Sequence, residues 1–217
     1  MAAKKISGKK SARAQKIPAK RDLPEERTTD RLAAFSDAIF AFAMTLLVFE
    51  IKVPDVPDNV SGGVLTTWMI SFLPKFLVYI LSFVVLGVFW VAHHRMFRHI
   101  NLHDDNLIWL NLLFLLTISL LPFPTAILGE YAHEPVAVSL YAACMALCGV
   151  FLSIIWMYAD SRNFISKKLE RSHIDSATRS GLITSCVFIV SIPISLHSPQ
   201  LAILSWLLIF PLRFFVK

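Results

Sequence analysis

Residues 31–54 read RLAAFSDAIFAFAMTLLVFEIKVP, an apolar stretch of membrane-spanning length that carries an aspartate, Asp37, near its start. A helix needs about 20 apolar residues to cross roughly 30 Å of hydrocarbon. A carboxylate within hydrocarbon is so costly that it persists only beside a partner, against water or inside a polar network. The stretch therefore predicts a transmembrane helix whose first turns are held by a specific polar contact.

Composition extends this interpretation to the whole chain. Its 217 residues are 56% hydrophobic, with a mean hydropathy of +0.62, which is more apolar than a water-soluble domain of that length. Apolar runs of about 20 residues recur along the chain and predict an all-α membrane protein with six transmembrane helices per subunit. The expected spans are residues 31–52, 66–92, 107–128, 134–159, 177–196 and 199–216.

The placement of charge predicts the topology. Basic residues gather in the N-terminal tail, after the second and fourth spans, and at the C-terminus, whereas the opposite loops are mainly acidic. By the positive-inside rule, we expect a multi-pass protein of the cell (inner) membrane with both termini in the cytoplasm. The acidic residues on the expected outer side are Asp55, Asp58, Glu130 and Glu134.

The N-terminal tail accounts for the net charge of +6, because residues 1–27 hold nine basic and three acidic side chains and the rest of the chain is balanced. This segment predicts a disordered cytoplasmic tail that contacts anionic lipid headgroups, not a surface for nucleic acid. Residues 28–217 form the predicted six-helix transmembrane domain, whose surroundings are the lipid bilayer.

The first span has two distinct faces when its residues are placed at 100° intervals. Ser36 and Asp37 lie away from an apolar stripe, at whose edge Thr45 is found. Lipid contact and ordinary helix packing are the common uses of such a stripe, and pore lining is a rarer one. The stripe consists of Phe35, Ala38, Phe42, Leu46 and Phe49.

Depth in the membrane suggests the partners of Asp37. The second span ends near the level of Asp37 with Trp90 and His94, and Asn111 lies one turn into the third span. All three side chains carry donors that reach a carboxylate. They predict either a structural knot that fixes the first helix against its neighbours or a proton relay built on Asp37 and His94.

Other candidate sites are weaker. His93, His94, His99 and His103 could bind a metal together with Asp104 and Asp105, but solvated loop histidines are the commoner case, so no metal site is predicted. Cys144 and Cys148 are expected to pack between helices. Glu50 and Lys52 either charge an outer vestibule or pair with each other or with Lys75. Because nucleophile, zincin and phosphate-loop motifs are missing, we do not expect an enzyme or a bound cofactor.

Three motifs resemble one known family. RxxxFSD (31–37) with TLLxxEIKxP (45–54), FWxxHHRxF (89–97), and NLLFLL with LPFP (111–124) are similar to the first three helices of the transmembrane protein 175 family of potassium channels, in its bacterial form. The resemblance covers roughly residues 30–216 and is weak in the last three helices. It implies a homotetramer of six-helix subunits, with a central pore on the symmetry axis lined by the first helix.

The resemblance also implies roles for individual residues. The family's pore positions fall on Phe42, Leu46 and Phe49, beside Thr45, and Phe42 replaces the usual aliphatic residue there. Phe49 stands where leucine is frequent, so the two rings indicate either a narrower pore or a pore face displaced by one position along the helix. The polar network of the FSD motif falls on Arg31, Phe35, Ser36, Asp37, Trp90, His94 and Asn111.

The predicted function is potassium-selective cation conduction. The T-V-G-Y-G filter of ordinary potassium channels is absent, so apolar constrictions must act on the permeant potassium ion. The alternative is a secondary transporter, perhaps proton-coupled, that uses Asp37 and His94. An intramembrane enzyme is a third class that no motif supports.

Overall fold

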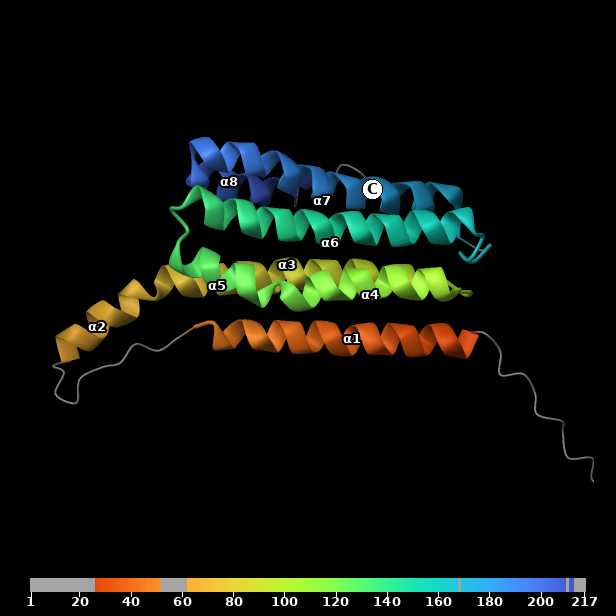
Figure 1. Cartoon of the computed structure of the whole chain (residues 1–217), viewed down its shortest axis with the longest axis horizontal. Coiled ribbons are helices and arrows are strands. Elements are labelled where there is room, and N and C mark those ends of the chain that lie inside the picture. Colours follow the sequence, from red (N-terminus) through yellow and green to blue (C-terminus); the bar gives the residue numbers. More distant parts are fainter. Residues whose placement is uncertain (1–25, 52–61, 168, 210, 213–217) are drawn as a thin grey trace, which may run out of the picture.

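The computed structural model describes residues 26–51, 62–167, 169–209 and 211–212, which form a bundle of long helices (Figure 1). The predicted tail of residues 1–27 lies outside this range except for Glu26 and Arg27, which open the first helix. Lys52, Asp55 and Asp58 also lie outside it. The helices are α1 Glu26–Phe49, α2 Gly62–Ser71, α3 Leu73–Phe97, α4 Asp105–Leu120, α5 Pro122–Glu130, α6 Pro135–Ser161, α7 Arg171–His197 and α8 Pro199–Ser205, followed by the 3-10 turn Trp206–Leu208.

Among the described residues, five helical segments are long and apolar enough to cross a membrane, and the overall class is the predicted all-α membrane fold. These segments are Thr29–Phe49, Met69–Phe97, Asp105–Glu130, Pro135–Ser161 and Arg171–His197. The sixth predicted span, residues 199–216, is described as the shorter apolar helix Pro199–Leu208, and part of it lies outside the described residues.

Two spans differ from the prediction for physical reasons. The third span consists of two helices, α4 and α5. Pro122 and Pro124 lack the backbone N–H that would continue α4. At the junction, the Leu121 N–H donates to the Ile118 carbonyl at 3.2 Å, three residues back in the chain. The fifth begins at Arg171 rather than residue 177, because a polar first segment extends the helix beyond its apolar part. Pro193 lies inside α7 without ending it.

Helix α1 lies at one side of the bundle, with α7 and α8 at the other (Figure 1). It packs against α3, α4 and α5. Phe40, Ala43 and Leu47 point into this contact and are almost fully buried, at the three- and four-residue spacing of one helical face. Because this face is the one that carries Ser36, the apolar stripe predicted from the sequence turns outward.

Helices α6 and α7 approach closely through small residues. A Cβ atom added at Gly181 would lie 2.7 Å from the Ser153 hydroxyl oxygen, and one added at Gly149 would clash with the Ser185 hydroxyl. Each serine donates back to a carbonyl on its own helix, Ser153 to Gly149 and Ser185 to Gly181. Reciprocal glycine-serine pairs of this kind let two membrane helices pack with their backbones near each other.

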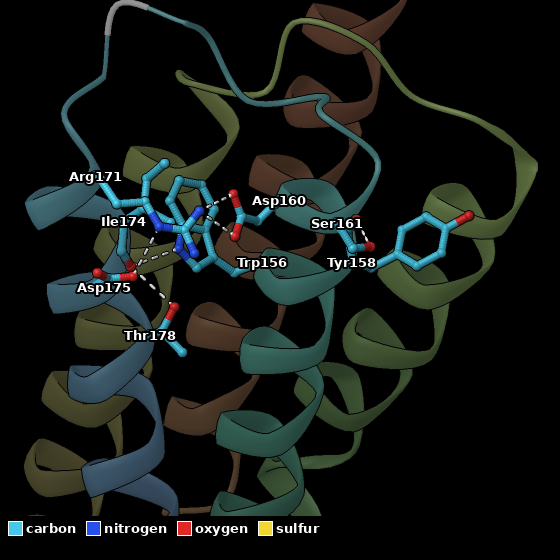
Figure 2. A network of polar contacts seen from close by, with 8 residues as sticks. All are labelled: Trp156, Tyr158, Asp160, Ser161, Arg171, Ile174, Asp175 and Thr178. Atoms are coloured by element: carbon cyan, nitrogen blue, oxygen red, sulfur yellow. Dashed lines mark hydrogen bonds and ion pairs between the residues drawn. The ribbon is translucent and has the colours of Figure 1, made fainter.

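The end of the bundle where α1 begins is rich in arginine, and we call it the basic end. Here the Arg171 guanidinium donates to both carboxylate oxygens of Asp160 at 2.8–2.9 Å and also lies 3.3 Å from the Asp175 carboxylate (Figure 2). In the same network, the Trp156 indole and the Thr178 hydroxyl donate to the Ile174 carbonyl. These contacts tie the start of α7 to the end of α6.

Candidate pore helix and its polar network

The outward face of α1 carries all four residues predicted to line a pore. In a single subunit Phe42 is 62% exposed and Phe49 is 74% exposed, and Thr45 is exposed between them. Leu46 is half-buried at the edge of this face. The Thr45 hydroxyl donates to the Phe42 carbonyl at 2.8 Å, so its hydrogen is used within the helix while its oxygen remains open as an acceptor.

The predicted polar network consists of two separate parts, and the inner part is buried. The Asn111 side-chain NH2 donates to the Ser36 hydroxyl oxygen at 2.9 Å, and Ser36 donates to the Leu32 carbonyl at 2.9 Å. The Asn111 side-chain carbonyl lies 2.9 Å from Nε2 of His93. Since a carbonyl can only accept, Nε2 carries the proton. This inner chain joins α1, α4 and α3.

Aromatic packing holds His93 in that position. Its ring stacks on Phe97, with centroids 4.2 Å apart, and lies nearly parallel to Phe114, with centroids 5.4 Å apart. Phe40 of α1 contacts the same ring from the third side. The histidine is therefore enclosed by three aromatic rings from α1, α3 and α4.

The outer part of the network is partly open to its surroundings. The Trp90 indole N–H donates to one carboxylate oxygen of Asp37 at 2.8 Å, and Nδ1 of His94 lies 3.8 Å from the other. The side chains of Asp37 and His94 are 38% and 43% exposed in the single subunit. An exposed pair at this distance contributes little stability by itself, so the Trp90 hydrogen bond is the stronger contact.

The structure differs from the predicted network at four residues. Asn111 bonds to Ser36 and not to Asp37, because its amide reaches the buried face of α1. His93, which the prediction omitted, is the third member of the inner chain. Arg31 and Phe35 lie on the exposed face of α1 and belong to neither part among the described residues.

A periodicity signal for His93 was present in the sequence. Leu86, Phe89, His93 and Phe97 recur at three- and four-residue intervals, and all four are buried in α3. This stripe marks the inner face of α3 and includes His93 but not His94. Depth in the membrane is nearly the same for His93 and His94 and cannot distinguish them. The position of His93 on the apolar stripe does.

The remaining histidines of the predicted cluster diverge. His94 faces Asp37, His99 lines a cleft described below, and Nδ1 of His103 lies 3.0 Å from the Thr29 hydroxyl at the start of α1. Among the described residues, no group of three or more His, Cys, Asp or Glu side chains is placed to hold a metal ion.

Polar contacts at the two ends of the bundle brace the helices. At the basic end, Asp104 caps α4 by accepting from the Leu107 N–H at 2.9 Å, and it accepts from the Tyr158 hydroxyl at 2.7 Å. The hydrogen bond from Tyr158 holds the pKa of the Asp104 carboxyl below its ordinary value. At the other end Lys75 forms an ion pair with Glu130, so Lys75 is engaged by α5 rather than by α1.

Comparison with known proteins gives a consistent result. Residues 31–122 match the family model "Endosomal/lysosomal potassium channel TMEM175". A potassium channel of Chamaesiphon minutus is 33% identical over 186 residues, which cover 84% of this chain and 91% of that protein. The crystal structure of a lysosomal potassium-selective channel TMEM175 homolog from Chamaesiphon minutus superimposes with a TM-score of 0.76 at 30% identity, covering 88% of this chain and 99% of that one.

A vertebrate relative shares a smaller part. The endosomal/lysosomal proton channel TMEM175 of Gallus gallus is 29% identical over 133 residues, which are 61% of this chain but 26% of that protein. This chain therefore spans most of the bacterial relative and about a quarter of the vertebrate one.

Proposed function

The chain belongs to the TMEM175 family, and on that premise we propose that it is the subunit of a potassium channel in which four copies of α1 surround a central pore. The observation that carries the proposal is the outward face of α1, which presents Phe42, Leu46 and Phe49, the residues that fall on the family's pore positions, together with Thr45. The relative from Chamaesiphon minutus, which is named a potassium channel and of which this chain covers 91%, supports the same function.

Symmetry is needed to turn this face into a pore. Helix α1 lies at the side of its own bundle, so the described helices of one subunit do not surround the outward face of α1 (Figure 1). Cyclic symmetry would bring copies of one face together around an axis. Large aromatic side chains at 62% and 74% exposure also favour a position against other copies of the chain.

Apolar rings give the proposed pore its selectivity mechanism. A narrow ring of Leu46 or of the two phenylalanines strips an ion of water without supplying ligands, and it closes the path when it dries. Potassium loses its hydration shell at a lower cost than sodium, so such a ring favours potassium. The open acceptor oxygen of Thr45 is the one polar group among these four positions that can partly replace lost water.

The polar network has a structural role in this proposal. The inner chain from Ser36 to His93 fixes the rotation of α1 about its axis, and the Trp90–Asp37 hydrogen bond fixes it a second time on the neighbouring face. Rotation sets which side chains point to the pore, so a rigid attachment is a condition for selectivity.

A proton-linked transporter is the second candidate. It is favoured by the partly exposed Asp37–His94 pair at 3.8 Å, which is open to exchange protons with its surroundings. The alternating arrangement that such a transporter needs would require the contacts of α1 to break and re-form in each cycle.

We further propose that the basic end faces the cytoplasm. Arg95, Arg98, Arg162, Arg171 and Arg179 all belong to this end, and the nine basic residues of the N-terminal tail precede it. The positive-inside rule then places both termini in the cytoplasm of a cell whose inner membrane the protein spans several times.

Flux measurements on the purified full-length protein test the function. Vesicles loaded with potassium are diluted into sodium buffer, and potassium efflux is followed with and without a protonophore. A channel gives rapid efflux that depends on the membrane potential and persists in Asp37→Asn. Slow efflux that requires a proton gradient and disappears in Asp37→Asn would replace the channel with the transporter.

A further inference from the structure

A cleft of about 970 Å³ opens between α3 and the pair α6–α7, toward the basic end of the bundle. Helix α3 packs chiefly on α1 and α5, whereas α7 packs on α6 and α8, so α3 and α7 are not packed closely against each other. The cleft lies outside the proposed pore, because Met44 reaches it from the side of α1 that is opposite Phe42. Its size falls within the range of ligand pockets, about 300–1,000 Å³.

The wall of the cleft changes character along its length. The inner part is apolar, with small residues that leave room between the helices. The part nearest the basic end carries Arg95, His99 and His173. The apolar and small lining residues include Val84, Gly87, Val88, Leu152, Ala177 and Gly181.

The charge at the mouth is not balanced by the protein. Among the described residues that line the cleft there is no aspartate or glutamate. Arg95 is exposed, and within the described part of the chain its guanidinium has no ion-pair partner. Arg171, by contrast, is occupied by Asp160 and Asp175. A positive charge at the mouth of an apolar cleft favours an occupant with an anionic head and an apolar tail.

We propose that this cleft binds an anionic phospholipid from the leaflet at the basic end, with its phosphate at Arg95, His99 and His173 and an acyl chain along α3 and α7. A guanidinium binds phosphate oxygens with two parallel hydrogen bonds, and each imidazole supplies at least one further N–H donor. Basic pockets between transmembrane helices on the cytoplasmic side are typical sites for anionic headgroups. A zwitterionic lipid would bring a cation toward Arg95 and would bind less well.

Quenching of tryptophan fluorescence by brominated lipid tests the site directly, because Trp90 and Trp156 line the cleft. The full-length protein is reconstituted in phosphatidylcholine vesicles that contain brominated phosphatidylglycerol or brominated phosphatidylcholine. In the natural protein we expect the apparent affinity of the cleft for brominated phosphatidylglycerol, taken from the quenched fraction, to exceed that for brominated phosphatidylcholine roughly fivefold. This ratio corresponds to the effect of one basic residue near the surface. Arg95→Gln should bring the ratio close to one, and Arg95→Lys should retain most of it.

Two further variants separate the cleft from general surface charge. Arg98→Gln removes an exposed arginine from the same helix end, outside the cleft lining, and should leave the preference unchanged. Ala177→Leu fills the cleft and should reduce quenching by both brominated lipids. Equal quenching by the two lipids in the natural protein, or equal losses in Arg95→Gln and Arg98→Gln, would overturn the proposal.

A second copy of the chain is the competing occupant, and a crosslink detects it. Ala177→Cys in a Cys186→Ser background places one accessible thiol in the cleft, because Cys144 and Cys148 are buried. Labelling of this thiol by a membrane-soluble maleimide supports a lipid-filled cleft. Efficient linkage to another subunit by a short bifunctional maleimide would show that protein covers it. These measurements involve no ion flux, so their failure would leave the proposed channel function untouched.

Discussion

At the scale of single residues, the inner hydrogen-bond chain ends on an atom without a partner. Nδ1 of His93 is buried and makes no hydrogen bond within the described part of the chain. An unsatisfied buried polar atom costs roughly 1–3 kcal/mol, so the three surrounding aromatic rings must offset that cost. These hydrogen bonds depend on Asn111, because its side-chain amide bonds to the Ser36 hydroxyl on one side and to the His93 imidazole on the other.

Asn111→Ala tests this dependence. The substitution leaves both nitrogens of His93 unsatisfied in a dry environment and opens a small cavity, so we expect a loss of about 1–3 kcal/mol in unfolding free energy. Thermal unfolding in detergent, followed by intrinsic fluorescence, measures it. Ser119→Ala on the same helix is the matched control, because its exposed hydroxyl bonds only to the Leu116 carbonyl. Equal shifts for the two variants would contradict the proposed role of Asn111.

Part of this network could be predicted from the sequence, and the part that could not depends on the rotation of each helix. Depth from the helix ends brought Trp90 and His94 to Asp37, as the structure places them. Depth does not give rotation, so it could not show that Asn111 faces Ser36 instead of Asp37. Counting residues from the helix ends was enough to find Trp90 and His94, the two partners of the Asp37 carboxylate. The inner hydrogen bonds among Ser36, Asn111 and His93 depend on the rotation of three helices about their axes, which counting does not give.

At the scale of helices, apolar length located the spans better than it located their ends. Residues 171–176 are polar except for Ile174, and the apolar length of the span left them outside it. The Arg171–Asp160 and Arg171–Asp175 contacts extend α7 to include them. Pro193 lacks the backbone N–H that continues a helix. It lies inside α7, where the following helix α8 packs against α7 and supports it.

A substitution at a single glycine tests the close packing of α6 on α7. In Gly149→Ala the new methyl group collides with the Ser185 hydroxyl, so the helices must separate or the serine must rotate out of its hydrogen bond. We expect a destabilisation of about 1–3 kcal/mol, the usual effect of overpacking. Thermal unfolding in detergent gives the value. Gly129→Ala is the control, since a Cβ at that position meets nothing within 4 Å, and a similar shift there would refute the packing argument.

At the scale of the whole molecule, the subunit carries an apolar face on α1 that its own helices do not cover. Four-fold assembly predicts that copies of this face meet at one axis. In a Cys186→Ser background, a cysteine replacing Leu46 should therefore form disulfides between subunits, read as a covalent dimer on a denaturing gel, because each thiol joins only one other. The same substitution at Leu204, exposed on α8 at the other side of the bundle, should give far fewer crosslinks. Monomers alone in the Leu46→Cys sample would exclude the proposed axis.

The proposed pore leads to a prediction about conduction. Leu46→Asn replaces an apolar ring with one that holds water, so the barrier to drying falls and ions keep more of their hydration. Single-channel current should rise, and the preference for potassium over sodium should weaken. Leu46→Trp should reduce current by narrowing the same ring. Leu204→Asn, which changes the same side chain far from α1, should alter neither property. If Leu46→Asn left current and selectivity at their natural values while Val48→Asn changed both, the pore would be lined by a face of α1 turned by almost half a circle, because Val48 lies two residues and about 200° further along the helix.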